Sequence, residues 1–177
     1  MRDGAAGVEW LKAQGIADPK RIACMGGSYG GYMVLAAITL YPDLWAAAVD
    51  IVGIANFVSF LENTSGYRRK LRESEYGVAG TDAAPGPDRE FLREISPIHR
   101  VKNIKIPLLV IHGEQDPRVP VGEAKQIEAA LKELGAPVQA LYYPDEGHGI
   151  AKLKNRLDCY PKIVDFLDKV LAKKPSP

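Results

Sequence analysis

Four short apolar runs, separated by segments with helical patterning, constrain the fold of this chain more than any other feature. The runs cover residues 21–26, 46–53, 106–113 and 138–145. The helix-patterned segments cover residues 3–14, 28–40, 121–134 and 155–172. Apolar strands that alternate with helices are typical of a parallel sheet whose two faces are both covered. The sequence therefore predicts an α/β fold with right-handed crossovers and helices on both faces of the sheet.

Two of the predicted helices carry apolar residues at helical spacing, which we expect to be buried against the sheet. In the helix over 121–134 these are Ala124, Ile127, Leu131 and Leu134. In the last helix they are Leu157, Ile163, Phe166, Leu167 and Val170.

Residues 54 to about 105 interrupt the alternation. This segment is rich in charge and contains GTDAAPGPD at 80–88, a loop by composition. It is too long for a simple connection, so we expect an insertion with its own helices over one end of the sheet. A length of 177 residues fits one domain, so 1–177 is predicted to be a single partial domain. The final KKPSP is expected to be frayed.

The charge balance argues against several classes of function. Lys and Arg number 23 and Asp and Glu number 22, which leaves no basic footprint for nucleic acid or an anionic membrane. The RRK run at 68–70 is interpreted as a solvated helix face, because Glu73 and Glu75 follow it. No apolar stretch is long enough to span a bilayer, and the N-terminus lacks the apolar core of a signal peptide. We expect a soluble, cytoplasmic protein.

The two cysteines, Cys24 and Cys159, predict neither a metal site nor a disulfide scaffold. Neither belongs to a C-x-x-C motif or a Cys/His cluster. Cys24 lies in the first apolar run and is expected to be a small buried side chain. The sequence therefore predicts no metal and no cofactor.

A G-x-S-x-G motif, Gly26-Gly27-Ser28-Tyr29-Gly30, lies between the first apolar run and the following helix. On such a strand-to-helix turn the serine hydroxyl is pushed out above the sheet, and glycines at 26, 27 and 30 let strand and helix approach closely. The N–H of Tyr29 is the natural donor to an oxyanion. The alternative is a glycine-rich turn with a capping serine. The context after a strand and before a helix favours a nucleophile.

A nucleophilic serine needs a general base, and only His148 lies in the expected place for one. It follows the fourth apolar run and precedes the last helix. His112 lies inside the third run and is interpreted as structural, and His99 precedes any late acid. The order serine, acid, histidine therefore favours His148.

The base in turn needs a carboxylate that orients it, and Asp116 is the favoured candidate. It follows the third apolar run by three residues. Loops at the carboxyl ends of neighbouring parallel strands lie together, so the Asp116 loop should meet the His148 loop. Asp145 is the competitor, and both Asp145 and Glu146 are expected to cap or brace the histidine loop instead.

The sequences GGSYGGYM, HGEQDPRVP and YPDEGHG, with IVGIANFVSFLENTSGYRRKLRESEYG between them, resemble the catalytic domain of the prolyl oligopeptidase family of serine peptidases. The similarity is to its acylaminoacyl-peptidase and dipeptidyl-peptidase-like branch and covers nearly the whole chain. It implies an α/β-hydrolase fold and hydrolysis of peptide or ester acyl groups. It also implies that Ser28 is the nucleophile, Asp116 the orienting acid and His148 the general base and acid.

The sequence departs from the family pattern on its N-terminal side. Family members normally carry a β-propeller, several strands before the nucleophile strand, and a His-Gly-Gly loop that donates to the oxyanion. No HGG occurs in this sequence. We therefore expect an abbreviated sheet that lacks these first strands and the propeller. An exposed edge at strand 21–26 is unfavourable, so we also expect a homo-oligomer that covers it. A fragment with a solvated edge is the alternative.

Two functions remain open at this point. The first is a serine hydrolase that acts on small esters or short peptides, since a missing oxyanion donor affects activated esters less than amides. The second is a catalytically silent binding or dimerisation module that retains Ser28, Asp116 and His148. The presence of all three residues favours the first. Tyr29 and Tyr67 are candidates for lining a pocket or for packing.

Overall fold

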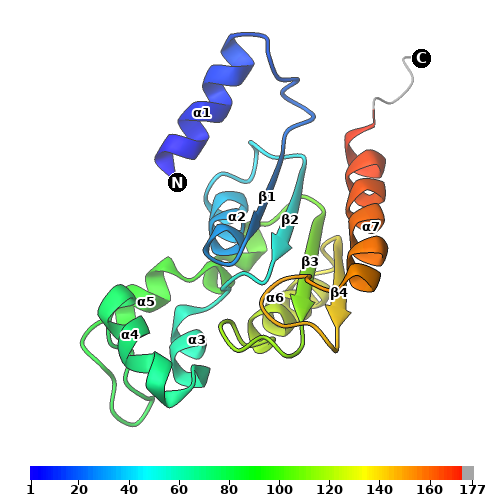
Figure 1. Ribbon diagram of the computed structural model, residues 1–177. Coiled ribbons are helices and arrows are strands. Elements are labelled where there is room, and N and C mark those ends of the chain that lie inside the picture. Colours follow the sequence, from blue (N-terminus) through cyan, green and yellow to red (C-terminus); the bar gives the residue numbers. More distant parts are fainter. Residues whose placement is uncertain (173–177) are drawn as a thin grey trace.

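A four-stranded parallel sheet forms the centre of the protein, in a computed structural model that describes residues 1–172. The strands are β1 (Ala23–Gly27), β2 (Ala47–Ile51), β3 (Leu108–Gly113) and β4 (Val138–Tyr143). They lie in the order β1-β2-β3-β4, and every neighbouring pair is parallel. All four carboxyl ends therefore meet at one edge of the sheet (Figure 1), and the predicted α/β fold is confirmed.

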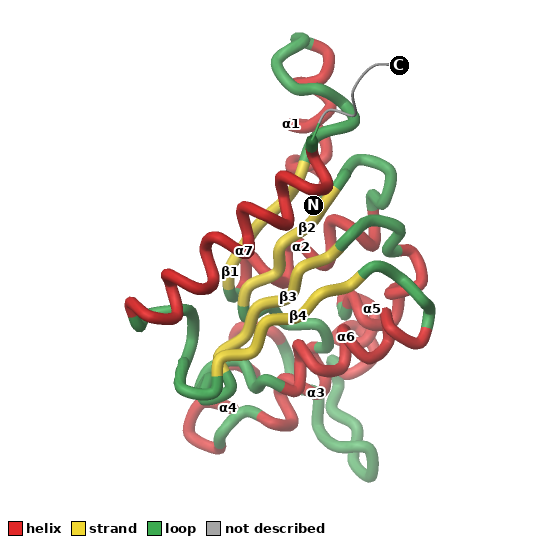
Figure 2. The backbone as a smooth tube through the Cα atoms, turned by 90° about the vertical axis from the view of Figure 1, so that its right-hand side faces the viewer, coloured by secondary structure: helices red, strands yellow, loops and turns green. Residues whose placement is uncertain are grey.

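Helices cover both faces of the sheet, as the alternating pattern predicts. The helices of the described residues are α1 (Arg2–Ala13), α2 (Tyr29–Leu40), α3 (Phe57–Asn63), α4 (Gly66–Tyr76), α5 (Arg89–Ile95), the 3₁₀-helix η1 (Pro97–Asn103), α6 (Gly122–Glu133) and α7 (Leu153–Leu171). Helix α7 crosses one face, whereas α2 and α6 lie against the other (Figure 2). Within residues 1–172 no helix is both long and apolar enough to cross a membrane. The predicted frayed end at 173–177 lies outside the described residues.

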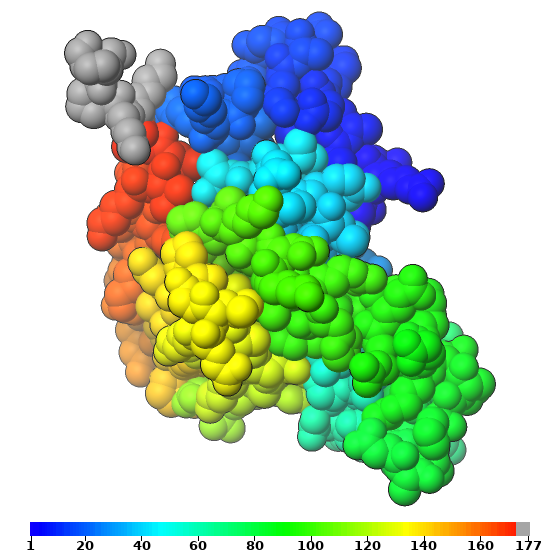
Figure 3. All heavy atoms as spheres, turned by 180° about the vertical axis from the view of Figure 1, so that it is seen from behind, coloured from blue at the N-terminus to red at the C-terminus, as the bar shows by residue number. Residues whose placement is uncertain are grey.

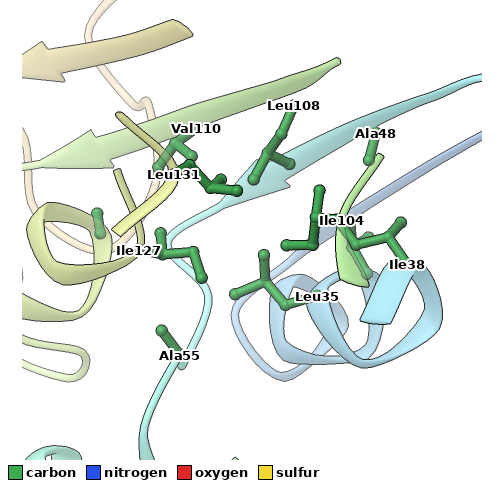
Figure 4. Close-up of a cluster of buried hydrophobic side chains, with 11 residues drawn as sticks. Leu35, Ile38, Ala48, Ala55, Ile104, Leu108, Val110, Ile127 and Leu131 are labelled. Atoms are coloured by element: carbon green, nitrogen blue, oxygen red, sulfur yellow. The ribbon is translucent and has the colours of Figure 1, made fainter. Parts of the chain in front are cut away.

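The apolar strands contribute to two cores, one on each face of the sheet. Between the sheet and helices α2 and α6, Leu35, Ile38, Leu108 and Ile127 are completely buried (Figure 4). On the α7 side, Ile163 and Phe166 pack against strand residues such as Val49 and Ile111. Burying one such side chain contributes roughly 1.5–3 kcal/mol, so strands apolar on both faces hold the layers together.

Two residues of the predicted helix faces are not buried. Leu134 is 53% exposed because α6 ends at Glu133, just before it. Leu157 is 68% exposed because it lies nine residues before Phe166, on the opposite side of α7. It lies with Leu153, Tyr160 and Val164 on the outer face of that helix. The prediction that these two leucines contact the sheet is therefore wrong.

Between β2 and β3 the chain forms a lobe of the three helices α3, α4 and α5, after which η1 returns to the body of the molecule and packs its Ile98 and Val101 against the core beneath α2 and α6. The lobe lies beyond the carboxyl ends of the strands (Figure 1) and projects from the body of the molecule, in green at lower right in Figure 3. Its own core contains Phe57, Phe60, Leu61 and Leu92, all essentially inaccessible to solvent. Helix α4, in contrast, has no buried residue.

Candidate active site

Ser28 lies in the sharp turn that joins β1 to α2. Its backbone has φ 60° and ψ −119°, a conformation that residues with a Cβ rarely adopt and that costs on the order of 1–3 kcal/mol. The N–H of Ser28 donates to the carbonyl of Ile51 at 2.9 Å, which ties the turn to β2. The turn holds the Ser28 hydroxyl at the carboxyl edge of the sheet.

The glycines around Ser28 differ in whether a side chain would fit in their place. A Cβ on Gly26 would overlap the carbonyl oxygen of Gly30, so the close approach of strand and helix depends on Gly26. A Cβ on Gly27 would lie 3.8 Å from its nearest neighbour, and one on Gly30 would meet nothing within 4 Å. Strand and helix therefore approach closely at Gly26 and Gly30, but the approach requires a glycine only at position 26. The motif misses Gly31, where a Cβ would lie 2.6 Å from the Cα of Gly53.

The structure brings Ser28, His148 and Asp116 into one chain of hydrogen bonds. The Oγ of Ser28 lies 2.8 Å from Nε2 of His148, and Nδ1 of His148 lies 2.7 Å from Oδ2 of Asp116. These residues come from the connections after β1, β4 and β3, respectively. In this arrangement the imidazole can take the hydroxyl proton of the serine while the carboxylate fixes its tautomer.

Asp116 is held in place by its own main chain. Its Oδ1 accepts hydrogen bonds from the N–H groups of Arg118 at 2.7 Å and Val119 at 3.0 Å. Burial would raise the pKa of the Asp116 carboxyl, but hydrogen bonds from His148 and these two N–H groups outweigh it and hold the pKa below its usual value. Asp116 therefore stays ionised and can accept the Nδ1 proton of His148.

His112 is completely buried, and its side chain supports the Asp116 loop. Its Nε2 lies 3.0 Å from the carbonyl oxygen of Val119 and 3.6 Å from Oδ2 of Asp116. Burial lowers its pKa, so the ring is neutral and donates to the Val119 carbonyl. This geometry agrees with the structural interpretation of His112.

Asp145 and Glu146 brace the loop that carries His148. Asp145 accepts hydrogen bonds from Lys152 and from Nδ2 of Asn155, each at 2.9 Å. Glu146, which is 2% exposed, accepts from the N–H groups of Ala151 at 3.1 Å and Lys152 at 2.8 Å. Both carboxylates are engaged on the α7 side of the loop, whereas Asp116 holds the imidazole.

Beside Ser28 lies a cleft of about 270 Å³. Its lining residues are Ser28, Tyr29, Ile54, Phe60, Arg72, Glu75, Tyr76 and Val119. The rings of Tyr29 and Tyr76 are parallel, with centroids 6.3 Å apart, and Arg72 pairs with Glu75 at 2.9 Å. Of the two predicted tyrosines, Tyr29 lines this cleft, while Tyr67 is 75% exposed and does not.

Apart from Ser28 and Tyr29, the sequence identifies none of the residues that line this cleft. The one available signal was the aromatic and apolar run IANFVSF, which supplies Ile54 and Phe60. At the elbow, the N–H of Tyr29 is the first of α2, where main-chain N–H groups have no acceptor within the helix. Within residues 1–172 no three His, Cys, Asp or Glu side chains are grouped to hold a metal ion.

Comparison with known proteins places the chain in a well-defined group. The sequence profile of the prolyl oligopeptidase family matches residues 1–174. The chain is 37% identical to dipeptidyl peptidase family member 6 of Caenorhabditis elegans over 170 residues, which are 96% of this chain and 23% of that protein. It is also 37% identical to dipeptidyl aminopeptidase BIII of Pseudoxanthomonas mexicana, again over 96% of this chain and 24% of that protein.

Solved structures agree with the sequence comparisons. A puromycin-hydrolyzing peptidase of Mycobacterium tuberculosis superposes with a TM-score of 0.84 at 30% identity, covering 99% of this chain and 26% of that one. The acylaminoacyl peptidase of Pyrococcus horikoshii gives 0.81 at 28% identity, over 96% of this chain and 27% of the other. The fold is thus that of an α/β-hydrolase. The chain spans about a quarter of the length of these relatives.

Proposed function

Because the chain belongs to the prolyl oligopeptidase family, we propose that it is a serine hydrolase that cleaves peptide or ester acyl bonds through an acyl-enzyme. The observation that carries this proposal is the unbroken hydrogen-bond chain from Ser28 Oγ through His148 to Asp116, with distances of 2.8 and 2.7 Å. The relatives found by sequence and those found by structure are both named as peptidases, which supports the same proposal.

Each residue of the chain of hydrogen bonds has a role in this reaction. Ser28 Oγ attacks the acyl carbon while His148 Nε2 takes the hydroxyl proton, and Asp116 stabilises the resulting imidazolium. The N–H of Tyr29 donates to the oxyanion that forms. His148 then gives its proton to the leaving amine or alcohol, and a water molecule hydrolyses the acyl-serine by the reverse sequence of proton transfers. No cofactor takes part in these steps.

We propose that the cleft binds an apolar or aromatic group of a short peptide or a small ester. The partly exposed rings of Tyr29 and Tyr76 offer it aromatic surface directly beside Ser28, and the buried side chains of Ile54, Phe60 and Val119 form the floor behind them. A related acylaminoacyl peptidase, with a TM-score of 0.80 and 28% identity, was solved in complex with Z-Gly-Gly-Phe-chloromethyl ketone, which carries a phenylalanine next to its reactive group.

Labelling with a fluorophosphonate tests the proposal, because this reagent phosphonylates only an activated serine. We expect stoichiometric labelling of the wild-type chain, with the modified peptide containing Ser28. Ser28→Ala should abolish it, whereas Ser74→Ala, on exposed α4, should not change it. An unlabelled wild type, or equal labelling of Ser28→Ala, would overturn the proposal in favour of a silent binding module.

We also propose that the chain self-associates through β1. Within residues 1–172 this strand pairs with β2 on one side only, and Met25 on it is 61% exposed. A free apolar strand edge favours pairing with another chain. Light scattering at micromolar concentration should report a dimer or larger species that Met25→Lys weakens. A monodisperse wild-type monomer would contradict this.

A further inference from the structure

Residues 52–56, which follow β2, connect the two parts of the candidate site. Immediately before them, Ile51, the last residue of β2, accepts the hydrogen bond from the N–H of Ser28 that fixes the elbow. In their middle, Ile54 forms part of the cleft wall beside Ser28. The position of this 52–56 segment therefore affects both the nucleophile and the shape of the cleft.

The 52–56 segment begins in a strained conformation. Val52 has φ 49°, and a positive φ is a genuine outlier for a β-branched residue. Such a conformation persists only where the surrounding contacts enforce it. Val52 is 2% exposed, and its N–H donates to the carbonyl of Ile111 at 2.8 Å. The far end of the segment needs an equivalent restraint.

Glu123 of α6 supplies that restraint. Its Oε2 accepts hydrogen bonds from the N–H groups of Ala55 at 3.1 Å and Asn56 at 2.7 Å, and its Oε1 lies 2.6 Å from the hydroxyl oxygen of Ser59. Glu123 is 2% exposed, and these three groups are all neutral. A buried carboxyl group without a cation is unfavourable unless hydrogen bonds satisfy it, so the site is built around this side chain.

Glu123 is also close in sequence to the acid, because it lies in the first turn of α6, directly after the connection that carries Asp116. It lies seven residues after Asp116 and four after Val119, which lines the cleft together with Ile54. A single carboxyl group thus joins the start of α6, next to the loop of Asp116 and Val119, to the segment that contains Ile54 and directly follows Ile51.

We propose that Glu123 is a positioning residue for the serine hydrolase reaction, holding the strained 52–56 segment so that the cleft wall and the Ser28 elbow keep their geometry. This inference rests on the proposed function only for its effect on reactivity. Its effect on the 52–56 segment can be measured independently.

The hydrogen bonds around Glu123 require an acceptor toward Ala55 and Asn56, and they do not require a charge. Burial raises the pKa of Glu123 to about 7, against the hydrogen bonds, which lower it. A proton on Oε1 can be donated to Ser59, whose hydroxyl also accepts from Gln126 at 3.0 Å and can donate to the carbonyl of Asn56 at 3.2 Å. Glutamine at position 123 can make the same pattern, whereas alanine cannot.

The test compares Glu123→Ala with Glu123→Gln in the full chain. The matched control is Glu128→Ala. This variant removes a carboxylate of the same helix, but one that accepts a hydrogen bond from Tyr142 and not from the 52–56 segment. Amide hydrogen exchange is measured at Ala55 and Asn56. Ser28 is labelled with a small and with an aromatic fluorophosphonate, at a temperature where all variants are folded.

We expect exchange at Ala55 and Asn56 to accelerate about tenfold in Glu123→Ala, as for the loss of buried hydrogen bonds. Labelling should slow, more for the aromatic probe than for the small one, because the cleft wall has moved. Glu123→Gln should restore both to within about twofold of wild type, and Glu128→Ala should change neither. Uniform loss of reactivity in both Glu123 variants, without altered exchange, would contradict a positioning role.

Further outcomes separate this inference from the proposed function. If the wild type does not react with either probe, the proposed function fails, and exchange alone decides the inference. If Glu123→Ala folds and its amide hydrogens at Ala55 and Asn56 exchange at the wild-type rate, the inference is overturned. If that variant does not fold, Ser59→Ala, which removes one partner of Glu123, should accelerate exchange at Asn56 by about two- to threefold. An unchanged rate there overturns the inference.

Discussion

The two sides of the cleft are built differently. Ser28, Asp116 and His148 lie on short connections after strands, and Asp116 and the elbow are fixed by main-chain hydrogen bonds. The opposite wall includes Arg72, Glu75 and Tyr76 of α4, a helix without a buried residue. The proposed reacting groups are thus tied to the sheet, whereas part of the opposite wall comes from a helix that only partly buries its side chains. Changes on the sheet side should therefore affect chemistry, and changes on the lobe side should affect which substrate binds.

The largest expected effect is on the sheet side, at Asp116. In Asp116→Asn the oxygen can still accept from Arg118 and Val119, but an NH₂ group then faces His148 Nδ1 and imposes the wrong tautomer. We expect turnover of a small ester to fall by about 10⁴-fold with little change in the melting temperature. Initial rates and circular dichroism measure the two quantities.

Asp145→Asn is the matched control for the acid. Asp145 bonds Lys152 and Asn155, so its loss should leave turnover within about tenfold of wild type. Unchanged turnover in Asp116→Asn, together with a large loss in Asp145→Asn, would move the orienting role to Asp145.

The second prediction concerns the packing of the elbow. In Gly26→Ala the new Cβ overlaps the main chain of Gly30, where nothing flexible can yield, so we expect destabilisation by about 1–3 kcal/mol. Gly30→Ala meets open space within α2 and should be neutral or stabilising by up to about 1 kcal/mol. Urea unfolding of both variants measures the difference. Equal effects would mean that the close approach at Gly26 is unimportant.

The sheet side was largely predictable from the sequence. Its strands are short, apolar and alternate with helices, and the G-x-S-x-G spacing specifies a turn that few other structures need. Asp116 and His148 could be placed because each follows a strand of the same parallel sheet, so their loops had to meet at one edge. These features depend on local pattern and topology alone.

The lobe side was not predictable in the same detail. Tyr67 and Tyr76 lie on the same helix and are chemically alike, yet only Tyr76 faces Ser28. The hydrogen bonds from Ala55 and Asn56 to Glu123 join residues that are more than 60 positions apart in the sequence. Such choices depend on tertiary packing, which the sequence pattern does not specify.

The third prediction uses these two tyrosines to test the lobe side. Tyr76→Ala removes one wall of the cleft, so the KM of an ester with an aromatic acyl group should rise by about tenfold, whereas acetate-ester turnover should stay within about threefold of wild type. Tyr67→Ala, also on α4, should change neither. An equal loss for both esters in Tyr76→Ala would show that α4 takes part in the chemistry.

The smallest expected effect is the pH dependence of stability. Burial raises the pKa of both Asp50 and Glu123 to about 7. Asp50 is 1% exposed, its Oδ1 lacks a hydrogen-bond partner within the described residues, and the nearby Glu123 carboxylate adds to the rise of its pKa. The protonated form of each carboxyl is thus favoured by folding. The resulting stability is present below the unfolded-state pKa and lost as the pH rises through about 7.

The contribution of Asp116 to stability depends on pH in the opposite direction. Its pKa is lowered in the folded protein, so the stability that its ionised form provides is lost only as the pH falls. Asp50 and Glu123 should therefore make the melting temperature fall between pH 6 and pH 8, where Asp116 is already fully ionised, while buried His112, whose pKa is lowered, contributes an opposing rise over the same range. Glu123→Gln should reduce that fall by an amount equivalent to about 1 kcal/mol, since one pKa unit corresponds to about 1.4 kcal/mol. Scanning calorimetry of wild type and variant across this range measures it. Parallel profiles would show that Glu123 is already ionised at pH 6, and the hydrogen bonds from Ala55, Asn56 and Ser59 would then have outweighed the effect of burial.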